Sequence, residues 1–144
     1  MALVTRNHPK LTLEGAHAVL GAAQRRSEEI RVPMNVAVVD DGGHLLVFER
    51  MDGAKPASIA ISLVKAQAAA LRRAATGPTM AGDQVNVPTA LGLAIADSGH
   101  QTPIRGGVPL VVDGQVIGAI GASAGTEDQD LDVARAGGAA IEKA

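Results

Sequence analysis

The chain has 144 residues, about the size of one domain with a single core. It contains no cysteine, which excludes disulfides, thiol catalysis and cysteine-ligated metal sites. The net charge is −2, aromatic residues make up 1%, and no basic run exceeds two residues, so nucleic acid is not an expected partner. No apolar stretch reaches the roughly 20 residues that span a bilayer, and residues 1–10 lack an apolar signal core. We therefore expect a cytoplasmic protein without a membrane partner.

Small residues dominate the apolar part of the sequence. Alanine and glycine are abundant, and there is one Phe with no Tyr or Trp. Small side chains fill little volume, so a core built from them requires close approach of backbones or burial against other subunits. We therefore expect a homo-oligomer.

Apolar residues at helical spacing predict a first helix that begins after Thr12 and ends before Pro33. His17 lies on the same face of this helix as Leu13 and Leu20. An imidazole on an apolar face is either a buried metal ligand or a histidine at the edge of the core that bonds a backbone carbonyl. Both interpretations stay open for His17.

Two apolar runs separated by a turn rich in Asp and Gly predict a β-hairpin over residues 36–50. Polar residues gather at both of its ends. Asp40 and His44 lie at the turn, whereas Arg50 and Asp52 lie at the open end. The usual rise of a strand separates the two ends by about 20 Å. We therefore expect two polar sites rather than one.

Residues 57–73 form a second predicted helix, which is rich in alanine. Lys65 lies on an apolar stripe of this helix, so its ammonium must either extend to solvent or meet a carboxylate. One interpretation is a structural ion pair with Asp40 or Asp52. The other is an anion site in which Lys65, Arg50 and Asp52 bind a carboxylate-bearing ligand.

The second half of the chain begins with a predicted loop, residues 79–88, and a short helix, residues 89–96. Asp113-Gly114 between two aliphatic runs is a strong hairpin signal for residues 108–123. A capping box that starts at Thr126 opens the last helix, and acidic residues in its first turn argue against a phosphate site there. This order predicts an α+β single domain with one antiparallel sheet of about five strands flanked by helices.

Several motifs occur in an order that resembles one known family: Val38-Val-Asp-x-Gly-Gly-His-Leu, Phe48-x-Arg-Met-Asp-Gly-Ala54, Lys65-Ala66, Gly106-Gly-Val-Pro109 and Asp113-Gly-x-Val-Ile-Gly-Ala-Ile-Gly121. The chain resembles the GlcG/HbpS-like haem-binding family, which includes the C-terminal domain of PduO-type proteins, over residues 11–141. The resemblance implies an α–β–α, profilin-like fold, a homo-oligomer, and a haem-binding or haem-degrading accessory protein encoded with a catabolic pathway.

The resemblance also implies haem as the cofactor and His17 as the candidate ligand of its iron. Arg50 and the turn formed by Arg105, Gly106 and Gly107 are further candidates for cofactor binding, because a Gly-rich turn beside an arginine suits an anionic group. Since the chain lacks the aromatic residues that commonly wall a large pocket, haem would lie between subunits. If His17 is not the ligand, His44 and His100 are the next candidates.

A second function of a different class stays open. It is a cofactor-independent small-molecule enzyme, of proton-transfer, isomerase or lyase type, that acts on a carboxylate-bearing catabolic intermediate. Arg50 and Lys65 would hold the carboxylate, and Asp40, Asp52 or His44 would move a proton. A third possibility is an oligomeric scaffold without chemistry.

Overall fold

Four antiparallel strands form the central layer of the structure, a computed structural model that describes residues 1–142. The sheet has the order β2-β1-β6-β5, and its strands are β1 (Asn35–Asp40), β2 (Leu45–Arg50), β5 (Gly107–Val112) and β6 (Gln115–Ser123). Both predicted hairpins are present, β1 with β2 and β5 with β6. The predicted single-domain α+β fold is confirmed, with four strands in the main sheet rather than about five.

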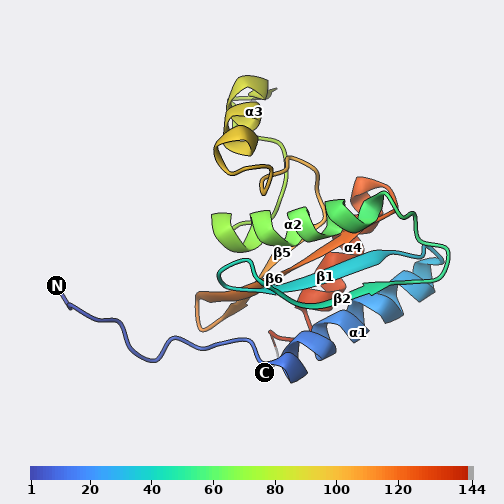
Figure 1. Cartoon of the computed structure of the whole chain (residues 1–144), viewed down its shortest axis with the longest axis horizontal. Helices are drawn as coiled ribbons and strands as arrows, with labels where there is room; N and C mark the ends of the chain where they lie inside the picture. Colours follow the sequence, from blue (N-terminus) through green and yellow to red (C-terminus); the bar gives the residue numbers. More distant parts are fainter. Residues whose placement is uncertain (143–144) are drawn as a thin grey trace.

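Helices cover both faces of this sheet, as Figure 1 shows. On one face lie α1 (Leu13–Ile30) and α4 (Glu127–Gly138), which enclose the larger apolar core with Val36, Val38 and Ile120. On the other face lies α2 (Ser58–Arg72), which packs its alanines on Ala37, Val39 and Ala119. The result is an α–β–α sandwich.

Glycines in the sheet bring α2 unusually close to β5 and β6. A Cβ at Gly121 would lie 2.1 Å from the carbonyl oxygen of Ser62, and a Cβ at Gly107 would lie 2.2 Å from that of Lys65. Both distances are below any real contact, so only glycine permits this packing. The small-residue composition therefore serves close helix–sheet packing, as the sequence predicted.

Capping and turn residues set the ends of two helices and of one hairpin. Thr12 caps α1, because its hydroxyl accepts from the backbone N–H of Gly15, and Thr126 with Gln129 forms the predicted capping box of α4. Asp113 and Gly114 both have positive φ, as a type I′ turn requires. Within the described residues no helix is both long and apolar enough to cross a bilayer.

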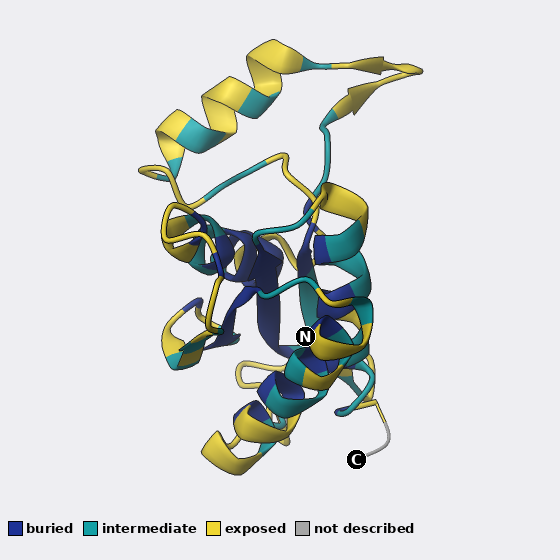
Figure 2. Cartoon of the chain, turned by 90° about the vertical axis from the view of Figure 1, so that its right-hand side faces the viewer, coloured by how far each residue is buried: buried dark blue, intermediate teal, exposed yellow. Residues whose placement is uncertain are grey.

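The segment 79–104 leaves the sandwich and is the least buried part of the chain apart from its N-terminus. It contains the hairpin of β3 (Met80–Ala81) and β4 (Gln84–Val85), followed by α3 (Val87–Ala96). The sequence predicted a loop with two possible short turns over 79–88, and it missed this short hairpin. No residue of α3 is buried, and Figure 2 shows the segment standing away from the rest of the chain.

Candidate functional site

Lys65 lies in a closed ion pair between α2 and α4. Its ammonium donates to Asp130 Oδ2 at 2.7 Å and to the carbonyl oxygen of Ala122 at 3.0 Å. The side chains of Lys65 and Asp130 are 0% and 4% exposed. The other carboxylate oxygen of Asp130 accepts from the backbone N–H of Gly125 at 2.9 Å. The expected partners of Lys65, Asp40 or Asp52, were therefore wrong.

The predicted Gly-rich turn closes over this ion pair. A Cβ at Gly106 would lie 2.9 Å from the ammonium of Lys65 and 2.7 Å from the carbonyl oxygen of Ala122. Gly106 also has φ of 122°, which side chains rarely adopt. Arg105 itself is exposed, and its backbone N–H donates to Glu127 at 2.9 Å. The turn thus leaves no space beside Lys65 for a small molecule.

Arg50 and Asp52 lie together in a different cavity, of about 460 Å³. Three carboxylates and one guanidinium face it, and the residues that line it are Gln24, Glu28, Glu49, Arg50, Met51 and Asp52. The Oε1 atom of Glu49 is buried without a hydrogen-bond donor among the described residues. An anionic ligand would meet a surplus of negative charge here. The structure therefore keeps the pair Arg50 and Asp52 but does not bring Lys65 to it.

Asp40 organises the turn at the other end of the hairpin. Its Oδ1 atom accepts from the backbone N–H groups of Gly42 and His44, both at 2.9 Å. In the register of the hairpin, Arg50 pairs with Asn35 at the opposite end of β1. The structure thus separates the two polar ends of the hairpin, as the sequence predicted.

His17 is exposed on α1, so its expected place on the buried face was wrong. The buried stripe of this helix includes Ala16, Leu20 and Ala23, as predicted, but it does not extend to His17. Leu13, one turn before His17, is 57% exposed. The imidazole therefore lies on an open surface with an apolar neighbour, accessible to a ligand or to another protein molecule.

The two remaining candidate histidines line one small cavity of about 210 Å³. Its walls come from the β1–β2 turn, α2 and the segment after α3: Gly42, Gly43, His44, Gln67, Leu71 and His100. The ring of His100 bonds the carbonyl oxygen of Asp97 through Nδ1 at 2.9 Å. Because a carbonyl only accepts, Nδ1 donates in this bond, and in a neutral ring Nε2 is then the nitrogen that could bind a metal. No spacing in the sequence indicated that His44 and His100 would line the same cavity.

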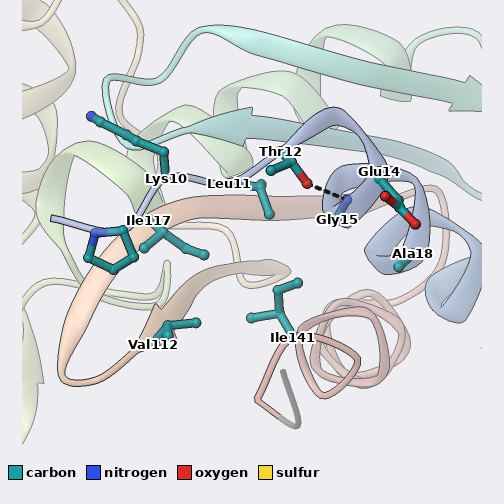
Figure 3. Close-up of a pocket in the computed structure, with 10 residues that line it drawn as sticks. Lys10, Leu11, Thr12, Glu14, Gly15, Ala18, Val112, Ile117 and Ile141 are labelled. Carbon is teal, nitrogen blue, oxygen red and sulfur yellow. Dashed lines mark hydrogen bonds between the residues drawn. The ribbon is translucent and has the colours of Figure 1, made fainter. Parts of the chain in front are cut away.

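A more apolar cavity, of about 350 Å³, lies where the N-terminal segment meets α1, β5 and β6. In Figure 3, Leu11, Val112, Ile117 and Ile141 point into it, while the ammonium of Lys10 points away. Lys10 instead pairs with Asp41 at 2.8 Å. No described group of three or more His, Asp or Glu side chains is arranged to hold a metal ion.

Comparison with known proteins places this geometry in a family. The family model described as "Haem degrading protein HbpS-like" matches residues 11–139. Protein GlcG of Escherichia coli K12 is 40% identical over 113 residues, which cover 78% of this chain and 81% of GlcG.

Two solved structures share the fold over nearly the whole chain. Protein ORFY of Klebsiella pneumoniae has a TM-score of 0.85 and 29% identity, and the match covers 100% of this chain and 99% of that one. The structure described as a PduOC:heme complex has a TM-score of 0.79 and 29% identity, with 92% and 96% covered. The motif match, the fold and these similarities together show that the chain belongs to the HbpS-like family.

Proposed function

We propose that this protein binds haem through an imidazole on its open surface. Two findings support the proposal: membership of a family described as haem-degrading, and similarity to a PduOC structure that contains haem. The observation that carries it is the exposure of His17 on α1, since imidazole is a common axial ligand of haem iron. The protein would act as an accessory to a catabolic pathway, in the cytoplasm.

The residues present fit the iron better than they fit the whole porphyrin. Imidazoles at His17, His44 and His100 are suitable donors, but the cavity that holds the last two is only about 210 Å³. Ligand pockets usually enclose roughly 300–1,000 Å³. The cavity that holds His44 and His100 is therefore too small to enclose a porphyrin, and His17 lies on an open surface, which favours haem held between two copies of the chain.

This chain's own groups would bind and orient the cofactor. His17 would ligate the iron, and the guanidinium groups of Arg105 and Arg50 are the predicted partners of carboxylates on the cofactor. At Arg50 the carboxylates of Glu28 and Glu49 would weaken that contact. Bound haem would supply a redox-active iron. Gly106 and Gly107 are buried and their backbone groups bond Thr76 and Ala122, so they would only position Arg105 and would not contact the cofactor.

Haemin titration of the purified protein tests the proposal. We expect a shifted Soret band that saturates, and we expect His17→Ala to abolish it, because the iron loses its protein ligand. His8→Ala is the matched control, since His8 is also exposed but lies in the N-terminal segment. If the His17→Ala and parent spectra are the same, His17 is not the ligand, and His44→Ala and His100→Ala then decide between the remaining candidates.

The enzyme alternative has less support. Lys65 cannot hold a substrate carboxylate because its ammonium is enclosed with Asp130. Arg50 and Asp52 remain as predicted catalytic residues, but the carboxylates of Glu28 and Glu49 around them oppose an anionic substrate.

A further inference from the structure

The segment 79–104, named the arm from here on, exposes a continuous apolar stripe. Val87, Leu91 and Ile95 follow one another at four-residue intervals on α3 and are 62%, 59% and 71% exposed. An adjacent cavity of about 300 Å³ is lined only by apolar residues, Val85, Val87, Ala90, Leu91, Ala94 and Pro103. Figure 2 shows that most of the arm faces solvent in the single chain.

An apolar stripe that stays exposed does not stabilise α3 in water. α3 has ten residues and buries none of them, and it makes no extensive contact with another described helix or strand. Isolated helices of this length are marginal, and helices in proteins gain most of their stability from packing an apolar face. The asparagine cap at Asn86 supports only the first turn. The arm therefore requires a cover from outside its own chain.

The outer face of α2 offers a complementary surface on the same side of the molecule. A groove of about 210 Å³ runs between this face and the root of the arm, lined by Ala60, Ile61, Val64, Gln101, Thr102 and Ile104. Figure 1 shows α3 standing above α2 rather than on it. One face thus carries both an apolar helix and an apolar groove. A two-fold dimer needs such a self-complementary patch, because each copy must supply both halves.

The charges of the two surfaces are also complementary. The arm has two carboxylates, Asp83 and Asp97, and no Lys or Arg. Residues 55–73 have no carboxylate, and Lys55, Arg72 and Arg73 are exposed there. A membrane is a poorer occupant, because helices that bind anionic lipid surfaces carry basic residues beside their apolar face. Standard interfaces use about 20–30 residues a side, which the arm and the outer face of α2 together supply.

We propose that the arm is a reciprocal clasp: α3 of each copy packs its stripe Val87, Leu91 and Ile95 on the outer face of α2 of a second copy. The clasp goes beyond haem binding and would form without the cofactor. It identifies the segment that holds two chains together, and it explains why an apolar helix projects from the sandwich.

Sedimentation velocity of the haem-free protein provides the first test. We expect the parent to be at least dimeric at micromolar concentration. Leu91→Asp should weaken the assembly more than about tenfold, since a charge would enter the centre of the interface. Leu13→Asp is the matched control, because Leu13 is 57% exposed on α1, which covers the opposite face of the sheet from α2, and it should assemble like the parent. Circular dichroism confirms that both variants fold.

Single cysteines provide the second test, because the chain has none of its own. One preparation carries Leu91→Cys and the other Val64→Cys, each with a tag of different mass. The two are mixed and treated with a short bismaleimide. We expect a hetero-dimer band, and a much weaker one when Leu13→Cys replaces Val64→Cys.

Three results would overturn the clasp. One is a parent protein that stays monomeric in solution, whether or not it floats with lipid vesicles. The second is a Leu91→Asp variant that sediments like the parent. The third is cross-linking to Leu13→Cys as efficient as to Val64→Cys. None of these measurements uses haem, so they leave the test of haem binding independent.

Discussion

The ammonium of Lys65 and the carboxylate of Asp130 lie 2.7 Å apart, and neither side chain is more than 4% exposed. This pair joins α2 to α4 across the end of β6, because the same ammonium also bonds the carbonyl oxygen of Ala122. Every group around it has a partner within the fold, including the second oxygen of Asp130. The pair therefore acts as a structural connection between the two faces of the sandwich.

Removal of one partner should be costly. We expect Lys65→Met to lower the free energy of unfolding by about 3–5 kcal/mol, because it leaves the Asp130 carboxylate buried without its counter-charge. Urea unfolding followed by far-UV circular dichroism measures this at a fixed protein concentration, since the chain has no Trp or Tyr for fluorescence. Lys10→Met is the control: Lys10 is 67% exposed and should cost less than about 1 kcal/mol. If Lys65→Met lowers the free energy of unfolding by no more than Lys10→Met does, the pair of Lys65 and Asp130 contributes little to stability.

The glycine turn over this pair should tolerate no side chain. Gly107→Ala would place a Cβ 2.2 Å from the backbone oxygen of Lys65. We expect it to destabilise the protein by about 1–3 kcal/mol or more, because the backbone of α2 must move. Gly92→Ala serves as the control, since a Cβ at Gly92 meets nothing within 4 Å and alanine favours a helix. The unfolding temperature should fall for Gly107→Ala and rise for Gly92→Ala. Equal shifts would contradict the close packing of α2 on β5.

Local chemistry made much of the fold predictable from the sequence. The Asp113-Gly114 turn and the capping box at Thr126 depend on residues that are neighbours in the chain, and both are present. The partner of Lys65 was not predictable in this way, because Asp130 is 65 residues away in the sequence. The acidic residues in the first turn of α4 suited the positive end of the helix dipole, and nothing local distinguished the one that turns inward.

His17 shows where the helical pattern was ambiguous. Small alanines such as Ala16 and Ala23 define the buried stripe of α1, whereas the larger Leu13 is mostly exposed. The predicted stripe contained these alanines and the buried Leu20, but it also included Leu13, and that end of the stripe placed His17 on the wrong face. In the same way, the cavity shared by His44 and His100 depends on a long-range approach of the arm root to the β1–β2 turn, which no sequence spacing encodes.

The contact between Lys10 and Asp41 should make stability depend on pH in the acid range. The hydrogen bond from Lys10 is the main cause that holds the pKa of Asp41 below its ordinary value, and partial burial opposes it. Because the folded-state pKa is lower than the unfolded value of about 3.9, the contact stabilises the fold above that pH. Its contribution is lost as the pH falls through the folded-state pKa.

Carbon-detected NMR titration of the Asp41 carboxyl measures this directly. We expect Lys10→Met to raise the pKa of Asp41 toward its ordinary value and to reduce the loss of stability on acidification. Arg25→Met, an exposed change on α1, should leave the titration of Asp41 unchanged. An unaltered pKa in Lys10→Met would show that the ammonium does not hold the carboxylate in solution.

Arg50 is a predicted ligand contact that a substitution can test directly. It is the one cation among the residues that line its cavity, and it is exposed, so Arg50→Met should retain the circular dichroism spectrum of the parent. If its guanidinium bonds a carboxylate of haem, its loss should cost about 1.5–3 kcal/mol of binding, which is roughly 10- to 150-fold in haemin affinity. Glu28→Gln should act in the opposite direction, because it removes one of the negative charges that face the same space. Haemin titration of both variants, with Arg25→Met as the control, decides the matter. An Arg50→Met protein that unfolds would show that Arg50 supports the structure of the hairpin end. A folded one with unchanged haemin affinity would show that Arg50 does not contact haem.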